Sequence, residues 1–287
     1  MERCDSARVR FLRTFEKGFH NGFARAVFRT LVAISVLLFP FGLYFVSSGV
    51  LPGQYRVMST VSVALYGIIA FVSELRTSRP AAVLQRAGTL FLVVFVIEWL
   101  GVTTGIPFGQ YTYTQNLPPL VAGVPPAIAV AWISVMFSSW RLARAAVPAD
   151  APVRFRLFAV ALAAAVFAVA FDTVLEPMAA FIQKYWVWEN GSVPVQNYTA
   201  WFAISFLAVF LLEKTAGASP ETEAGMRATA FFVYGFQFVT FLVAGLVNGF
   251  VGNAAIAVAL LGGVLLAAFL GRRPSSRNPI HRSSTGA

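Results

Sequence analysis

Long apolar runs, separated by short polar segments, constrain the fold of this chain more than any other feature of its sequence. Eight runs occur, at 27–47, 57–73, 88–100, 120–140, 155–176, 200–213, 228–248 and 253–271. A helix needs about 20 mostly apolar residues to cross a bilayer, and only 12% of the residues are charged. The sequence therefore predicts an all-α integral membrane protein, a bundle of about eight transmembrane helices. The third and sixth runs are short, and their helices can extend into the flanking segments.

The basic residues predict the orientation of these helices. Of the 22 Lys and Arg residues, all but Arg56 and Lys184 fall in the two terminal segments and in the second, fourth and sixth loops. Cytoplasmic loops are enriched in Lys and Arg, so both termini are predicted to be cytoplasmic. We expect a basic cytoplasmic arm at 1–26, a polytopic helical membrane domain at 27–271 and a disordered basic tail at 272–287. The expected location is the inner (plasma) membrane, crossed several times.

The net charge of +10 is also found in nucleic-acid-binding proteins, but here the cations gather at the two ends and on one side. That distribution is typical of anchoring at an anionic cytoplasmic leaflet, so we expect membrane lipid as a partner and no nucleic acid. Cys4, His20 and His281 all lie in the terminal segments. Because no Cys or His lies in the membrane domain, we expect its chemistry to use carboxylates, hydroxyls, amides and aromatic rings.

Three acidic residues, Glu98, Asp172 and Glu176, lie in apolar segments away from the predicted cytoplasmic ends. An acidic side chain at the centre of a membrane helix costs about 2.5–3.5 kcal/mol on insertion scales, and such residues often mark function. The alternative is an acid that reaches water at a helix end or is held by interhelical hydrogen bonds. Both interpretations stay open for Glu98, whereas for Asp172 with Glu176 the sequence favours the functional interpretation.

The spacing of the pair supports a functional role. Residues four apart share a helix face, with Cβ atoms about 5–6 Å apart. Two carboxylates that close resist joint ionisation in a poorly hydrated site, so one keeps its proton beside an anion. Pro177 follows directly and is expected to end or kink the helix. Asp172 and Glu176 would then form a proton donor with an adjacent electrostatic partner.

Two other acids, Glu74 and Glu213, fall at the predicted cytoplasmic ends of the second and sixth helices. We expect both to be solvated or paired with the nearby Arg76 and Lys214.

Two aromatic segments are predicted on the outer side: EWLGVTTGIPFGQYTYT at 98–114 and WVWENGSVPVQNYTAW at 186–201. An interfacial belt accounts for the Trp and Tyr residues, but it does not account for the acids beside them. We expect Glu98 and the acid pair at one membrane depth, in a cavity between the third and fifth helices that both segments cover. Ring faces attract cations, so this combination suits protonation of an alkene and control of the resulting carbocation.

At these residues the chain resembles the carotenoid 1,2-hydratase family (CruF type), which includes bisanhydrobacterioruberin hydratases. The resemblance rests on E-x-x-G-x-x-T-G-x-P-F-G-x-Y-x-Y from Glu98 to Tyr113 and on GVPPAIAVAW at 123–132. It continues in D-x-x-x-[DE]-P from Asp172, followed by W-x-W and P-x-x-N-[FY]-x-x-W as far as Trp201. The chain departs from the family pattern in having Glu176 in place of Asp, and Ser in place of Gly at position 192.

The resemblance implies that water is added across the terminal double bond of an acyclic carotenoid end group, giving a tertiary alcohol, with no cofactor and no metal. The implied substrate is a fifty-carbon carotenoid like bisanhydrobacterioruberin, or a forty-carbon one like lycopene or γ-carotene. Other enzymes of carotenoid biosynthesis are candidate partners. Under this hypothesis the neutral member of the acid pair, or Glu98, protonates the alkene, and another carboxylate orients the water together with Asn197 or a Tyr hydroxyl.

The candidate catalytic residues are Glu98, Asp172, Glu176, Asn197 and Tyr111. The candidate substrate-binding residues are Trp99, Thr104, Phe108, Tyr113, Trp132, Trp186, Trp188, Tyr198 and Trp201. For Tyr111, Tyr113 and Thr104, interfacial anchoring and loop hydrogen bonding are an equal alternative.

Three other functions share parts of this pattern. A carotenoid cyclase also begins with protonation, but its product has the mass of the substrate, whereas hydration adds one water. A UbiA-like prenyltransferase would bind Mg²⁺ and a diphosphate through its acids at the cytoplasmic side, whereas these acids are predicted outside. A carotenoid-binding protein or proton-coupled transporter would use intramembrane acids without forming a product.

Overall fold

The fold was analysed in a computed structural model, which describes residues 22–49, 53, 56–76, 78–215 and 223–271. Eight helices in these ranges are long and apolar enough to cross a membrane, so the predicted all-α, multi-span architecture is confirmed. They are α2 (Ala24–Ser48), α3 (Arg56–Leu75), α4 (Pro80–Thr104), α5 (Pro126–Ala146), α6 (Val153–Pro177), α7 (Val195–Thr215), α8 (Glu223–Val247) and α9 (Val251–Leu270). The predicted tail at 272–287 and residues 1–21 of the predicted arm lie outside the described residues.

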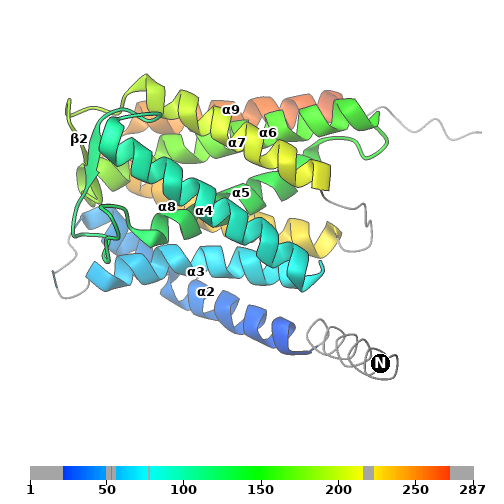
Figure 1. The fold of residues 1–287 in the computed structure, drawn as a ribbon, viewed down its shortest axis with the longest axis horizontal. Helices are drawn as coiled ribbons and strands as arrows, with labels where there is room; N and C mark the ends of the chain where they lie inside the picture. Colours follow the sequence, from blue (N-terminus) through cyan, green and yellow to red (C-terminus); the bar gives the residue numbers. More distant parts are fainter. Residues whose placement is uncertain (1–21, 50–52, 54–55, 77, 216–222, 272–287) are drawn as a thin grey trace, which may run out of the picture.

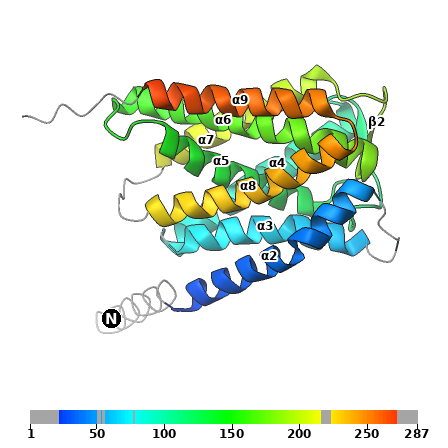
Figure 2. The same ribbon diagram turned by 180° about the vertical axis from the view of Figure 1, so that it is seen from behind.

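The helices lie side by side, with α2 at one edge of the bundle, α9 at the other and α5 in the middle (Figures 1 and 2). The core is built around α5, where Trp132, Met136 and Trp140 are fully buried. Small side chains let neighbouring helices approach this core closely. Ala164 and Ala168 of α6 are fully buried, and a Cβ at Gly67 of α3 would overlap Val130 of α5.

Two helices extend into the aromatic segments, as the short third and sixth runs allowed. Helix α4 reaches Thr104 and ends at Gly105, whose φ of 76° is left-handed and whose N–H bonds the carbonyl of Gly101. Glycine adopts this conformation at little cost, which makes it a common helix end. Helix α7 begins at Val195, so Asn197 and Trp201 lie on a helix and not in a loop.

The boundaries predicted for the fourth run, at 120–140, were wrong by six residues at each end. Helix α5 begins at Pro126 and ends at Ala146. Proline fits the first turn of a helix, where its missing N–H has no partner to lose. The residues before Pro126 therefore form a connection, and Arg141 and Arg144, predicted to lie in a loop, belong to the helix.

A short two-stranded ribbon covers one end of the bundle (Figure 1). Strand β1 (Tyr111–Tyr113) pairs antiparallel with β2 (Trp186–Trp188), so that Tyr111 lies opposite Trp188 and Tyr113 opposite Trp186. Successive side chains of a strand point to opposite faces. The four rings consequently share the face of the ribbon that points toward the bundle. The ribbon also joins the α4–α5 connection to the connection between α6 and α7.

The expected solvation of Glu74 and Glu213, or their pairing with Arg76 and Lys214, was wrong. Glu74 is buried and accepts a hydrogen bond of 2.8 Å from Nε of Arg141. The carboxylate of Glu213 accepts hydrogen bonds of 2.7 Å from both Arg156 and Trp140. Residues one or two positions apart on a helix do not face each other. Both acids therefore pair with cations from other helices.

Candidate active site

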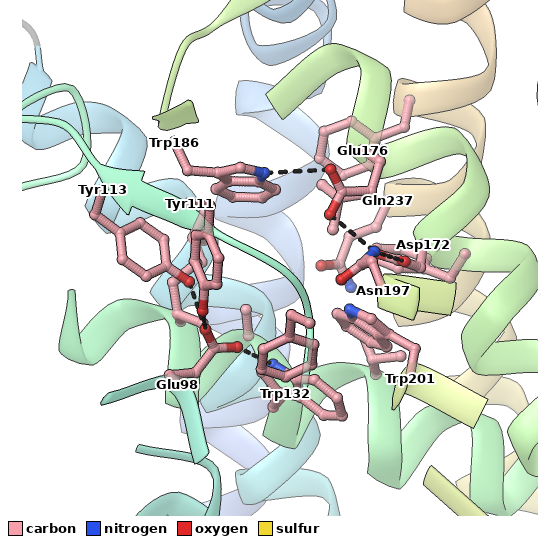
Figure 3. A pocket seen from close by; sticks show the side chains of 18 of the residues that line it. Glu98, Tyr111, Tyr113, Trp132, Asp172, Glu176, Trp186, Asn197, Trp201 and Gln237 are labelled. Atoms are coloured by element: carbon pink, nitrogen blue, oxygen red, sulfur yellow. Dashed lines mark hydrogen bonds between the residues drawn. The ribbon is translucent and has the colours of Figure 1, made fainter. Parts of the chain in front are cut away.

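A cavity of about 70 Å³ lies beneath the ribbon, within the bundle. Figure 3 shows Glu98 on one side of it and Asp172, Glu176 and Asn197 on the other. A single water needs about 10–15 Å³ of such space, so the cavity can hold a few waters or the end of a hydrocarbon chain. The predicted site residues that line it are Glu98, Phe108, Tyr111, Tyr113, Trp132, Asp172, Glu176, Trp186, Trp188, Asn197 and Trp201.

Glu98 forms the first acidic position, one and a half turns before the end of α4. Its Oε2 accepts hydrogen bonds from the hydroxyls of Tyr111, at 2.6 Å, and Tyr113, at 2.8 Å. Its Oε1 accepts one of 3.1 Å from Nε1 of Trp132. Burial, together with the Glu98 carboxylate, raises the pKa of both Tyr111 and Tyr113 well above its usual range. The two hydroxyls therefore stay protonated and act as donors.

The lack of a side chain at Gly101 makes this arrangement possible. A Cβ there would lie 2.8 Å from the Tyr111 hydroxyl oxygen and 2.9 Å from the ring of Phe108. Gly101 follows Glu98 by three residues, so both lie on the same face of α4. The glycine of the E-x-x-G motif thus leaves room for the ring whose hydroxyl reaches the acid.

The acid pair forms the second acidic position, on α6. The amide of Asn197 donates to both acids, at 2.8 Å to Oδ2 of Asp172 and at 3.2 Å to Oε1 of Glu176. The Nε1 atoms of Trp186 and Trp188 donate to Oε2 of Glu176, at 3.2 and 3.1 Å. The two carboxylates therefore share one helix face, as their spacing predicted. The α-helical part of α6 ends at Pro177, and a π-helical turn, η3 (Met178–Ile182), continues the chain.

The two members of the pair differ in their hydrogen bonding. Glu176 accepts three hydrogen bonds, and both of its oxygens are used. Asp172 is fully buried, and none of the described residues donates to its Oδ1. A buried acceptor with no partner costs about 1–3 kcal/mol. Protonation of Asp172 would lower this cost, because a neutral carboxyl group is cheaper to bury without a partner than a carboxylate.

Aromatic rings form the walls between the two acidic positions. Trp132 and Trp201 stack with centroids 3.8 Å apart and planes inclined by 14°. The ring centroids of Tyr111 and Trp188 lie 5.1 Å apart across the ribbon. Such ring faces attract a cation by about 2 kcal/mol or more where water is excluded. A positive charge that formed in the cavity would therefore meet both carboxylates and π faces.

The structure places three predicted substrate-binding residues away from this cavity. Trp99 is 42% exposed, and Tyr198 is only partly buried. Each directly follows a cavity residue, Glu98 or Asn197, and consecutive helical residues point in different directions. The hydroxyl of Thr104 donates to the carbonyl of Leu100, at 2.7 Å, within its own helix.

One polar residue of the cavity was not predicted. Gln237 of α8 lines it and is nearly buried. Its Nε2 donates to Oγ of Ser134, at 2.7 Å, and to the carbonyl of Val233, at 2.9 Å, so its amide hydrogens are used within the protein. The sequence carried a signal, because a glutamine in the apolar run 228–248 is costly in lipid and usually faces other helices.

Metal-ligating side chains do not gather anywhere in the described ranges. No three or more His, Cys, Asp or Glu residues there are placed so that they could hold a metal ion. Although Glu98, Asp172 and Glu176 line one cavity, their oxygens are occupied by Tyr, Trp and Asn donors, apart from Oδ1 of Asp172.

Comparison with known proteins connects this site to a family. Over 140 residues the chain is 31% identical to the bisanhydrobacterioruberin hydratase of Haloarcula japonica. That match covers 45% of this chain and 45% of the relative, so it spans less than half the length of the relative. No solved structure matches the chain. Residues 53–268 match the family described as carotenoid biosynthesis protein. This range includes both acidic positions and the ribbon, and the chain therefore belongs to that family.

Proposed function

We propose that this protein is a carotenoid hydratase, which adds water across the terminal double bond of an acyclic carotenoid by acid catalysis. The observation that carries the proposal is one small cavity in which Glu98 and the Asp172/Glu176 pair face each other between aromatic rings. Membership of a carotenoid biosynthesis family and the likeness to a hydratase support a carotenoid as substrate. The substrate class is a fifty-carbon or forty-carbon acyclic carotenoid, and the reaction requires no redox cofactor.

Asp172 is the proton donor in this mechanism. It has one oxygen without a partner, whereas Glu98 and Glu176 each accept three hydrogen bonds that suit an anion. The Asp172 proton goes to the less substituted alkene carbon, where a C–H bond forms as the π bond breaks. The positive charge then lies on the tertiary carbon. A proton transfer positioned in this way is worth about 10²- to 10⁴-fold in rate.

Glu98 completes the addition from the other side of the cavity. A water attacks the tertiary carbon, its oxygen forms the new C–O bond, and its proton passes to Glu98. The net change is the addition of one water, and the proton returns from Glu98 to Asp172 through water in the cavity. The rings of Trp132, Trp201, Tyr111 and Trp188 stabilise the cation before the water attacks.

The proposed topology has both termini in the cytoplasm and the ribbon on the outer face of the plasma membrane. The domain limits are those expected from the sequence, 1–26, 27–271 and 272–287. The position of Arg141, Arg144 and Arg156 supports this topology, because these residues lie at the ends of α5 and α6 remote from the ribbon. Labelling of single cysteines placed at Gln115 and Asp150, with Cys4→Ser in both variants, tests it in intact cells: only the former should react with an impermeant reagent.

The function is tested by producing the protein in cells that accumulate lycopene or a fifty-carbon acyclic precursor and measuring pigment masses. Wild type should add one water per reacting end, and Asp172→Asn, Glu98→Gln and Glu176→Gln should lose most of this product. Trp99→Phe is the matched control, because Trp99 adjoins Glu98 but faces away from the cavity. A product with the mass of the substrate would indicate a cyclase. Metal-dependent reaction with a prenyl diphosphate would indicate a prenyltransferase.

A further inference from the structure

A second and larger cavity, of about 300 Å³, lies between α2, α3 and α8. It is lined mainly by apolar side chains, among them Leu38, Phe39 and Phe45 of α2 and Met58 and Leu65 of α3. Its wall on α2 runs from Ser35 to Val46, which is about 17 Å of helix at 1.5 Å per residue. We call this second cavity the α2 groove.

The α2 groove adjoins the acid cavity. Val63, Gln237 and Phe241 line both of them. These three residues come from α3 and α8 and form the junction between the two spaces. A long molecule with its end at the acids would therefore have its next segment at this junction and the remainder in the α2 groove.

Helix α2, which forms one wall of the α2 groove, changes direction along its length (Figure 2). Pro40 lies inside the helix, where it removes a backbone hydrogen bond and bends the helix. Gly42 adds no side chain, and a Cβ there would meet no atom within 4 Å. Two hydrogen bonds of 2.8 Å hold the end of α2, from Gln183 to the carbonyl of Phe45 and from Asn248 to that of Ser47.

The outer surface of α2 indicates where the α2 groove is reached from. Phe41, which lines the α2 groove, is 65% exposed, and Leu37, beside groove residues on the same helix, is 72% exposed. In a membrane these apolar side chains face lipid, so the groove borders the hydrocarbon region where a carotenoid dissolves.

We propose that the α2 groove binds the polyene chain of the substrate and that the end group passes Val63, Gln237 and Phe241 to reach the acids. The identity of this occupant rests on the proposed function. A polyene is a long, stiff hydrocarbon without hydrogen-bonding groups, and the α2 groove offers a long apolar wall that leads to the proton donor. The small acid cavity then holds only the last carbons and a water.

Pigment binding tests this proposal separately from catalysis. The protein carries Asp172→Asn in all samples, is purified from cells that make the acyclic carotenoid, and is reconstituted into phospholipid nanodiscs. Bound polyene is measured by its visible absorbance per protein. Gly42→Phe fills the α2 groove without a backbone clash and should lower bound pigment at least about tenfold. Ser62→Phe, on the α3 side of the groove, should do the same and covers the case in which one variant fails to fold.

The control is Gly88→Phe on α4. Gly88 is also a helical glycine with no atom within 4 Å of a Cβ, but it lies on the exposed surface and lines neither cavity. It should retain the pigment bound by Asp172→Asn alone. Normal pigment binding by folded Gly42→Phe and Ser62→Phe would overturn the groove proposal while leaving the hydratase proposal standing.

Two other outcomes separate the two proposals. Loss of pigment in both groove variants, with no hydrated product from wild type, would support the groove and reject the hydratase. The second outcome concerns phospholipid that stays bound after delipidation. If its amount falls only in Gly42→Phe and Ser62→Phe while bound pigment is unchanged, an acyl chain occupies the groove and the proposal is overturned.

Discussion

Tyr111 and Trp188 lie directly opposite each other across the ribbon, yet they donate their hydrogen bonds to different acids. The Tyr111 hydroxyl binds Glu98, and Nε1 of Trp188 binds Glu176. Tyr113 and Trp186 repeat this arrangement in the next pair. The ribbon therefore sets the relative position of the two acidic positions that the proposed reaction uses.

Removing one donor from each side of the ribbon should slow hydration in both cases. A hydrogen bond to a charged group contributes about 1.5–3 kcal/mol, so Tyr111→Phe and Trp188→Phe should each lower the rate about 10- to 100-fold. The measurement is hydrated product formed per minute by purified protein in nanodiscs. Tyr44→Phe is the control, because Tyr44 is an exposed residue of α2. Equal rates for Tyr111→Phe and wild type would contradict a role for this bond.

Asn197→Ala should disable the acid pair without touching Glu98. In this variant none of the described residues donates a hydrogen bond to Asp172, and Glu176 loses one of its three hydrogen bonds. We expect hydration to fall at least about 100-fold and the thermal unfolding temperature to fall as well, because buried acceptors lose their partner. Thr199→Ala, an exposed position of the same helix, should change neither. If Asn197→Ala kept the rate and lost only stability, Asn197 would have a structural role alone.

Gly101→Ala should reduce activity more than stability. The added Cβ would lie 2.8 Å from the Tyr111 hydroxyl oxygen, which forces the ring away from Glu98. We expect a rate loss similar to that of Tyr111→Phe, and the double variant should be little worse than either single variant, because all three remove the same bond. Gly88→Ala on the same helix has open space at its Cβ and should behave as wild type. Additive losses in the double variant would rule out this explanation.

The buried ion pair between Glu74 and Arg141, at the end of the bundle opposite the ribbon, should contribute to stability and not to catalysis. Arg141→Leu removes the guanidinium that binds Glu74, and breaking a buried ion pair from one side costs about 3–5 kcal/mol. The unfolding temperature in detergent should fall clearly, while the rate per folded protein stays the same. Glu74→Leu added to Arg141→Leu should restore much of the stability, since an apolar pair is often tolerated there. No recovery in the double variant would contradict this account.

Sequence reasoning reached the acid pair because the relevant geometry is local. Residues 172 and 176 share a face in any α-helix, and an acid in an apolar run points inward for a physical reason. It missed the ribbon, although Y-x-Y and W-x-W alternate as strands do, because three-residue strands form only when a partner lies beside them. It also missed the partner of Glu74, since Arg141 is far away in the sequence and is brought near only by the packing of α3 on α5.

The α2 groove was beyond sequence reasoning for a similar reason. Pro40 and Gly42 indicate a bend in α2, but the space beside a bent helix depends on what α3 and α8 place there. Gln237 was visible as an isolated amide in an apolar run. Its position at the junction of two cavities follows only from the three-dimensional arrangement of the helices.

The sequence distances of the hydrogen bonds have a consequence for biogenesis. Glu98 finds two of its donors 13 and 15 residues further along the chain, and Glu176 finds two of its own after 10 and 12 residues. Each acid-bearing helix is thus followed directly by hydrogen-bond donors that can offset the free energy of burying its carboxylate. During cotranslational insertion, the translocon can release each helical hairpin into lipid with most of its polar contacts already made, before the complete catalytic chamber has closed.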